Sequence, residues 1–175
     1  MDNLLNSEAT TALILLGILI VTYGILRSIF FPAVKKLANR TSTFIDDLFL
    51  DKKFLNRLSY VIVFIIFNIL TATPEFSIDL FSNVIVSRLI DAAFALLVGL
   101  TILEVLSVFN KISEKIDVLK DRPIKGYIQI LKIIISAFVV IIIFAIVTGQ
   151  SVAYYISGLG ALTAVLLLVF QDTIL

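Results

Sequence analysis

Three charged side chains, Arg88, Asp91 and Glu104, interrupt an otherwise apolar stretch of this chain at residues 84–109. An ionised group in apolar surroundings is costly, so such a residue is a candidate for an ion or proton pathway. Arg88 and Asp91 are three residues apart, so on a helix they would share a face and neutralise each other. All three lie toward the ends of the stretch, where they can extend to water. We therefore favour interfacial or structural roles over a relay, and the sequence shows no convincing partner for Glu104.

The rest of the sequence offers little chemistry. It contains no Cys, which excludes disulfides, thiol catalysis and cysteine-bound metals. It contains no His, the commonest general base and metal ligand. Paired carboxylates, a glycine-rich phosphate loop and a Ser/His/Asp set are also missing. We therefore predict that the chain is not an enzyme and that it holds no cofactor and no metal.

Composition identifies the surroundings in which this chain folds. Of its 175 residues, 60% are hydrophobic and 15% are charged, and the formal net charge is +1. Soluble domains have about 45–50% apolar and about 25% charged residues. The balanced charge gives no electrostatic reason to bind polyanions, so we predict no nucleic-acid partner. The composition predicts an integral membrane protein whose first partners are membrane lipids.

Helices that cross a bilayer need roughly 20 predominantly apolar residues. We place five such spans at residues 9–31, 58–74, 84–109, 126–148 and 152–175. Pro32 is expected to end the first span, because proline cannot continue the helical hydrogen-bond ladder. The 39 residues from Ile133 to Gln171 are uncharged, and as one helix they would be about 58 Å long, nearly twice the hydrocarbon thickness. We therefore predict a break at residues 148–151 and a tight hairpin of the last two spans.

Outside the predicted spans, lysine and arginine occur only in the connections on one side of the membrane. The connection at residues 32–57 holds six of them and the connection at 110–125 holds five. The tail at 1–8, the connection at 75–83 and the turn at Gly149 hold none. Because cytoplasmic loops are enriched in these residues, the sequence predicts an all-α, multi-pass protein with its N-terminus outside and its C-terminus inside. A tail without basic residues also argues against a cleaved signal peptide.

Both basic connections contain an apolar pattern near helical spacing. In the first it runs from Phe44 to Leu55, and in the second it comprises Ile112, Ile116 and Leu119. Such patterns are typical of short helices at the membrane interface, next to anionic headgroups. Pro123 is expected to end the second of these helices. The alternative is that both segments are plain connectors with a helical turn.

The last span differs from the others in its small residues, which include Gly158. On a helix, five positions lie within about 100° of one another: Ser157, Gly160, Ala161, Ala164 and Leu168. Small residues on one face let helix backbones approach closely in lipid, as several copies around an axis would require. A ring of leucines facing such an axis would form an apolar constriction that gates by dewetting. The alternative is ordinary packing against the other spans of the same subunit.

The same span resembles the pore-lining helix of a known family. Residues 158–175 read Gly-Leu-Gly-Ala-Leu-Thr-Ala-Val-Leu-Leu-Leu-Val-Phe-Gln-Asp-Thr-Ile-Leu and resemble that helix in the small-conductance mechanosensitive channel (MscS) family. Residues 121–132, Asp-Arg-Pro-Ile-Lys-Gly-Tyr-Ile-Gln-Ile-Leu-Lys, are similar to the start of span four in its five-span, YbdG-type branch. Over the first three spans the resemblance is one of topology. It implies a homoheptamer, a pore lined by span five, and a β-rich cytoplasmic domain that follows the membrane part.

The resemblance also assigns individual positions. The two constricting positions of the family fall on Ala164 and Leu168, and the glutamine before its helix bend falls on Gln171. Alanine at 164 leaves Leu168 as the main seal. The bend itself, glycine in typical members, falls on Asp172, which lacks the backbone freedom of glycine. A ring of Asp172 carboxylates near the inner mouth would favour cations, a hypothesis that reversal potentials test.

These observations lead to one expected function and two alternatives. We expect a mechanosensitive channel subunit of a bacterial inner membrane, which releases ions and osmolytes under hypo-osmotic stress. The first alternative is a proton- or ion-coupled secondary transporter that uses the charges of the third span, although neither an internal repeat nor midplane charges support it. The second is a membrane anchor or assembly subunit, which would not explain the stripe of small residues.

Overall fold

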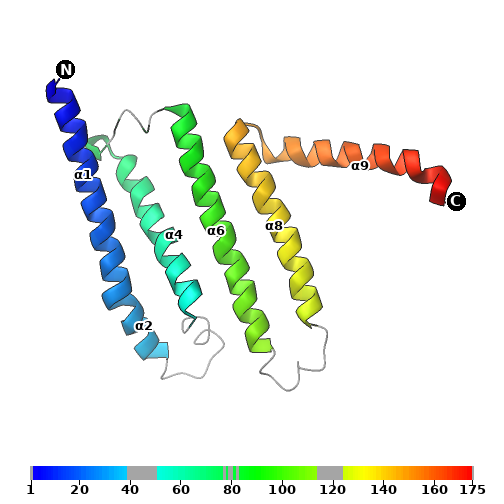
Figure 1. Ribbon diagram of the computed structural model, residues 1–175, viewed down its shortest axis with the longest axis horizontal. Coiled ribbons are helices and arrows are strands. Elements are labelled where there is room, and N and C mark those ends of the chain that lie inside the picture. Colours follow the sequence, from blue (N-terminus) through cyan, green and yellow to red (C-terminus); the bar gives the residue numbers. More distant parts are fainter. Residues whose placement is uncertain are drawn as a thin grey trace.

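The computed structural model describes residues 2–38, 51–76, 78, 81, 83–113 and 124–174, and this part of the chain is helical and free of strands (Figure 1). Its long helices are α1 (Asp2–Ile25), α4 (Lys52–Thr71), α6 (Val84–Ser113), α8 (Ile124–Thr148) and α9 (Val152–Ile174). Its short elements are the π-helix η1 (Leu26–Phe30), α2 (Phe31–Ala38) and the 3₁₀-helix η2 (Pro74–Phe76). Five helices are long and apolar enough to cross a membrane, which confirms the all-α, multi-pass prediction.

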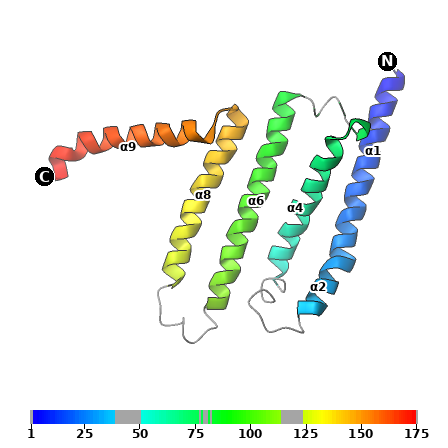
Figure 2. The ribbon, with the colours of Figure 1, turned by 180° about the vertical axis from the view of Figure 1, so that it is seen from behind.

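Four of the long helices lie side by side in one layer, in the order α1, α4, α6 and α8 (Figure 1 and Figure 2). Successive helices run in opposite directions. The end of α2, the start of α4, the end of α6 and the start of α8 therefore lie at the same end of the layer. Both basic connections join helices at this end, which agrees with their common charge. We call it the basic end.

The helix that begins at Asp2 does not stop at Pro32, so that prediction is wrong. The chain continues through η1 and α2 to Ala38, and the backbone N–H of Phe31 donates to the carbonyl of Leu26, five residues earlier. Proline removes one regular hydrogen bond and crowds the preceding turn. A π-turn holds one extra residue and shifts the bonding by one position. The widened turn lets the helix pass the proline.

The first basic connection is partly helical, because α4 begins at Lys52 rather than at the apolar run from residue 58. Asp51 caps this start, since its carboxylate accepts hydrogen bonds from the backbone N–H groups of Lys53 and Phe54. Phe54 and Leu55 then pack with Phe31 in a small buried cluster at the basic end. The remaining predicted interfacial segments, and Pro123, lie on residues 39–50 and 114–123, outside the described part of the chain.

Most large apolar side chains of the layer are exposed in the isolated chain. The most apolar helix, α8, has a mean hydropathy of 3.2 over its candidate span, yet only 6% of that span is buried. In water such a surface would drive aggregation. In a bilayer the hydrocarbon chains cover it, so a thin layer with little interior is stable there.

Helices α6 and α8 approach each other closely at Gly99 on α6. A Cβ atom at this position would lie 2.6 Å from Cγ2 and 3.2 Å from Cβ of Val139 on α8. These separations are shorter than the optimal carbon–carbon contact of about 3.5–4.0 Å. Only glycine lets α6 and α8 approach this closely.

Replacing Gly99 with valine is expected to lower the free energy of unfolding by about 1–3 kcal/mol, as overpacking does in closely packed interiors. Thermal unfolding of the purified protein in detergent measures the effect. Gly17→Val is the matched control, because nothing lies within 4 Å of a Cβ atom at Gly17. Equal unfolding temperatures for the two variants would contradict the close approach of α6 and α8.

The last helix leaves the layer. The break lies where it was predicted, since α8 ends at Thr148 and α9 begins at Val152. However, α9 points away from α8 and from the rest of the layer (Figure 1 and Figure 2), so the predicted tight hairpin is wrong. The apolar character that predicted the hairpin does not by itself attract one helix to another, because in lipid the acyl chains satisfy it equally well.

Candidate functional site

The buried charge of α6 has a partner on the neighbouring helix. Glu104 is only 8% exposed, and its Oε2 lies 3.0 Å from Nη1 of Arg57 on α4. The same guanidinium donates a hydrogen bond of 2.5 Å to the carbonyl of Leu100. A buried carboxylate requires a nearby opposite charge to stay ionised. Arg57 is therefore the partner that the sequence did not reveal.

A second polar contact joins α6 to α8 close to this ion pair. Nζ of Lys132 donates a hydrogen bond of 2.9 Å to Oγ of Ser107. Ser107 is three residues from Glu104, so the two share one face of α6 within a single helical turn. Lys132 is the sole charge between residues 126 and 171. Polar contacts thus link α4, α6 and α8 at one depth.

A second ion pair lies nearer the basic end. Oδ2 of Asp51 accepts a hydrogen bond of 2.7 Å from Nζ of Lys111, at the end of α6. Burial of the Asp51 carboxylate opposes its ionisation, but the hydrogen bonds from Lys111 and from the backbone N–H groups of Phe54 and Lys53 outweigh burial and hold its pKa below the usual value. Asp51 therefore caps α4 and ties it to α6.

Replacing Asp51 with asparagine is expected to lower the free energy of unfolding by about 0.2–1 kcal/mol at neutral pH, because asparagine still caps α4 but cannot pair with Lys111. The pKa of Asp51 is lower in the folded than in the unfolded chain. The stabilisation is therefore complete above the unfolded value of about 3.9 and is lost as pH falls through the folded value.

Thermal unfolding at pH 7 and at acidic pH measures this difference between the variant and the wild type. Asp51→Ala removes the cap as well and should cost about 1 kcal/mol more. Equal losses in Asp51→Asn and Asp51→Ala would contradict the capping role. A difference between Asp51→Asn and the wild type that did not shrink in acid would contradict the ion pair.

The predicted pairing of Arg88 with Asp91 is not formed. Within the described residues, the ion pairs are Arg57–Glu104 and Asp51–Lys111, and Asp91 is exposed. The guanidinium of Arg88 lies instead against Gly149, at the place that a Cβ atom of residue 149 would occupy. Arg88 and Asp91 do share a helix, but the side chain of Arg88 packs on the α8–α9 turn instead.

The turn between α8 and α9 is held by a small set of contacts, and we call it the elbow (residues 148–151). Gly149 has a φ of +73°, in the region that glycine adopts without strain. The backbone N–H of Gln150 donates to the carbonyl of Ala145, and the hydroxyl of Tyr155 donates to Oγ1 of Thr148 over 2.8 Å. With Arg88 packed on it, the elbow connects α6, α8 and α9.

The residues predicted to line a pore or pack its helix all lie on α9. From Ile156 to Gln171 every side chain is exposed, and Leu168 is 73% exposed. A Cβ atom at Gly158 or Gly160 would meet nothing within 4 Å. Asp172 lies within α9, but its side chain is outside the described part. Packing against spans one to four, the alternative considered for this helix, is therefore not what the structure shows for this segment.

The three charges predicted as candidates in the third span, Arg88, Asp91 and Glu104, do not come together. Arg88 and Glu104 are 16 positions apart on one helix, which corresponds to about 24 Å, and they contact different helices. A proton or ion relay would need its charged groups to lie within hydrogen-bond distance of one another or to be joined by water. The structure therefore brings Glu104 to Arg57 and Arg88 to the elbow, and joins neither to Asp91.

Sequence reasoning missed Arg57, Lys132 and the Asp51–Lys111 pair. A usable signal was present for Arg57, at the edge of an apolar run, and for Lys132, inside one, because a cation in such a position needs a polar partner. For Asp51, the capping position before α4 was the signal.

Comparison with known proteins finds no family model and no solved structure that matches this chain.

Proposed function

We propose that this protein is the subunit of a mechanosensitive ion channel, in which α9 helices of several copies line the pore and membrane tension opens it. The observation that carries the proposal is α9 itself. It has the length and mean hydropathy of a membrane span, and none of its candidate span is buried in the chain. The channel would release ions and osmolytes during hypo-osmotic shock, in a bacterial inner membrane.

The sequence of α9 suits contact between copies better than contact with lipid alone. Its stripe of small residues, from Ser157 to Ala164, is exposed. Small residues allow the close backbone approach that drives helix association in membranes. A lipid-facing helix has no need of such a stripe. The resemblance to the MscS family adds the expectation of seven copies.

Gating in this proposal depends on Leu168. A ring of leucine side chains excludes water from a narrow pore and so blocks ions without a charged barrier. Tension favours whichever state has the larger area in the membrane plane, and only in proportion to that difference. Widening of the α9 ring would wet the Leu168 constriction. Ala164, one turn earlier, would leave a wider ring.

The layer of α1, α4, α6 and α8 would act as the tension sensor. Its outer faces are apolar and exposed. Three polar contacts, Arg57–Glu104, Asp51–Lys111 and Lys132–Ser107, tie α4, α6 and α8 together. The elbow is the covalent link from this layer to α9, with Arg88 of α6 packed on it. Movement of the layer would reach the pore helix there.

Patch-clamp recording of the protein in liposomes under stepped suction tests the proposal. Conductance that rises with suction would support it. Saturable, proton-coupled uptake without conductance would favour the transporter alternative. Stable complex formation with neither conductance nor uptake would favour an anchor or assembly subunit.

Oxidation of single-cysteine variants tests the packing of α9 between copies, and the chain has no native Cys to interfere. We expect Ala161→Cys to form covalent dimers in the membrane, because a disulfide needs Cα atoms within about 7 Å. Leu159→Cys is the matched control, since it lies about 200° away around the helix and is also exposed. Dimers in both variants, or in neither, would contradict a small-residue interface between α9 helices.

A further inference from the structure

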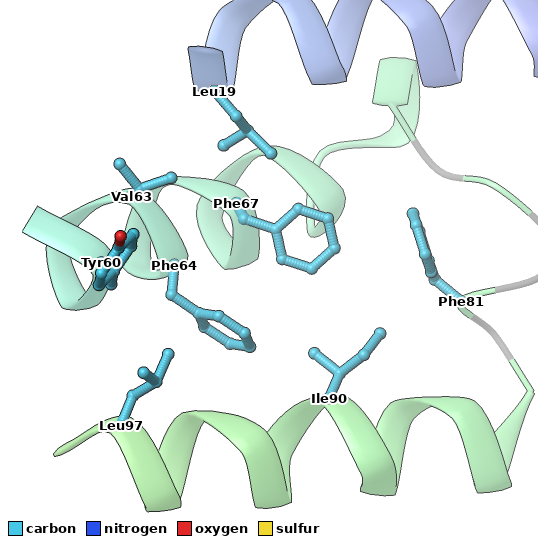
Figure 3. Close-up of a pocket in the computed structure, with 8 residues that line it drawn as sticks. All are labelled: Leu19, Tyr60, Val63, Phe64, Phe67, Phe81, Ile90 and Leu97. Atoms are coloured by element: carbon cyan, nitrogen blue, oxygen red, sulfur yellow. The ribbon is translucent and has the colours of Figure 1, made fainter. Parts of the chain in front are cut away.

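Two cavities lie one after the other along α4, the first against η1 and α2 and the second against α1 and α6, and we call this strip the α1–α4 seam. The first, of about 240 Å³, lies at the basic end and is lined by Arg27, Phe31, Pro32, Lys52, Leu55 and Asn56. The second, of about 650 Å³, lies deeper in the layer and is apolar, with Phe64 and Phe67 of α4 and Leu97 of α6 among its walls (Figure 3). We refer to them as the end pocket and the groove.

The end pocket is positively charged. Arg27 and Lys52 contribute two cations, and its other lining residues contribute no acid. Among the described residues neither cation takes part in an ion pair, and Arg27 uses one nitrogen, Nη1, to donate to the Tyr23 hydroxyl over 2.7 Å. Two cations beside an apolar wall of Phe31 and Leu55 suit a phosphate group attached to a hydrocarbon.

The π-turn builds one wall of this pocket. In a regular helix, Arg27 and Pro32, five residues apart, would point in clearly different directions. The extra residue of η1 brings positions five apart onto the same face. Arg27, Phe31 and Pro32 consequently line one cavity. Because π-turns are uncommon and are found frequently at functional sites, this location is an independent indication of a site.

The two cavities open along the same faces of their helices. On α4, Lys52, Asn56, Tyr60, Val63 and Phe67 recur at helical spacing and run from the end pocket to the groove. Leu19 on α1 and Arg27 on η1 are eight residues apart, and Tyr23 of α1 lies between them in the sequence. Figure 3 shows Leu19, Phe64, Phe67 and Leu97 directed into the groove.

Tyr23 and Tyr60 lie between the two cavities. Their rings stack with a centroid separation of 5.7 Å, and Tyr60 also lines the groove. Tyrosine is enriched at the level of the bilayer where headgroups meet acyl chains. The seam therefore presents cations, then phenol hydroxyls, then an aromatic and aliphatic groove, in the order of the parts of a phospholipid.

We propose that the α1–α4 seam binds one anionic phospholipid of the leaflet at the basic end. Arg27 and Lys52 hold its phosphate headgroup, the two tyrosines lie beside its ester linkages, and one acyl chain occupies the groove. Charge complementarity selects an anionic headgroup over a zwitterionic one. Continuity with the groove selects a lipid over a soluble anion. The site does not depend on the channel proposal, because it lies within the layer and involves no residue of α9.

A single tryptophan placed in the groove tests this proposal, since the chain has no Trp of its own. The protein with Phe64→Trp is reconstituted into vesicles of phosphatidylcholine containing phosphatidylglycerol with brominated acyl chains, which quench tryptophan on contact. Brominated phosphatidylcholine in the same proportion serves as reference. We expect phosphatidylglycerol to quench several-fold more effectively at Phe64→Trp, and both lipids to quench equally at Phe138→Trp, an exposed position on α8.

Charge variants in the Phe64→Trp background distinguish a specific lipid site from general electrostatic attraction between the protein and anionic lipids. Arg27→Gln and Lys52→Gln should each reduce the preference for phosphatidylglycerol about fivefold, the effect of one cation near an anionic surface. Arg27→Lys should keep most of it. Lys53→Gln, adjacent and exposed but outside the pocket, should leave it unchanged.

Three results would overturn the proposal. Equal quenching by the two lipids at Phe64→Trp would show that the groove has no headgroup preference. Equal losses for Lys52→Gln and Lys53→Gln would show diffuse attraction rather than a site. Loss of the preference on adding inorganic phosphate at millimolar concentration would assign the end pocket to a soluble anion. Circular dichroism of each variant confirms that its helices are intact.

Discussion

Leu168→Ser is expected to lower markedly the membrane tension at which the protein conducts. In the proposed closed pore, Leu168 side chains of several copies exclude water, and opening hydrates them. Exposing one leucine to water costs about 1.5–3 kcal/mol, so a ring of seven shifts the balance between closed and open states by on the order of 10 kcal/mol. Serine removes most of that cost. Patch-clamp recording under stepped suction measures the threshold for both proteins.

Leu166→Ser is the matched control for this experiment. It makes the same chemical change two positions away, about 200° around α9, and Leu166 is also largely exposed in the chain. We expect its threshold to stay close to that of the wild type. Ala164→Leu should act in the opposite direction, because it adds a second apolar ring. An unchanged threshold in Leu168→Ser would show that this residue does not form the constriction.

Arg57→Leu is expected to destabilise the protein by about 3–5 kcal/mol, because it leaves the buried carboxylate of Glu104 without its cation. Glu104→Leu should cost less. The Arg57 side chain is 35% exposed whereas that of Glu104 is 10% exposed, so an unpaired arginine can extend to water. The double variant should recover most of the loss, since two apolar residues can replace a buried ion pair. Unfolding in detergent measures all four proteins.

Asp91→Leu serves as the reference for losing a charge on α6 that makes no ion pair within the described part of the chain, and we expect little change in stability. Additive losses in the Arg57→Leu/Glu104→Leu protein would contradict a direct interaction between the two residues. The same variants separate structure from transport. If a stably folded Glu104 variant abolished proton-coupled uptake that the wild type performs, the transporter alternative would replace the channel proposal.

The sequence was sufficient for the features that depend on lengths along the chain. Apolar run lengths predicted five membrane-spanning helices, because hydrocarbon thickness sets how many residues a span needs. The same argument placed the break between α8 and α9, where Gly149 has a positive φ. The clustering of lysine and arginine in two connections matches the end of the layer at which α2, α4, α6 and α8 meet those connections.

Predictions from local sequence rules were wrong at two places, the helix end at Pro32 and the pairing of Arg88 with Asp91. Proline ends a helix unless the turn before it widens, and η1 provides that widened turn at Leu26–Phe30. Spacing alone paired Arg88 with Asp91, but Arg88 packs on Gly149, which is distant in sequence. A side chain as long as arginine reaches several competing positions, and spacing on its own helix considers one of them.

The pairing of Arg57 with Glu104, the contact of Lys132 with Ser107 and the course of the α1–α4 seam were decided by the tertiary structure. Each depends on how two helices are rotated and offset against each other. That rotation follows from side-chain packing, such as Val139 against Gly99, which hydropathy does not encode. The sequence by itself therefore determined which segments cross the membrane and where they turn, because those depend on solvation along one chain. The tertiary structure determined which charges meet, because that depends on contacts between helices.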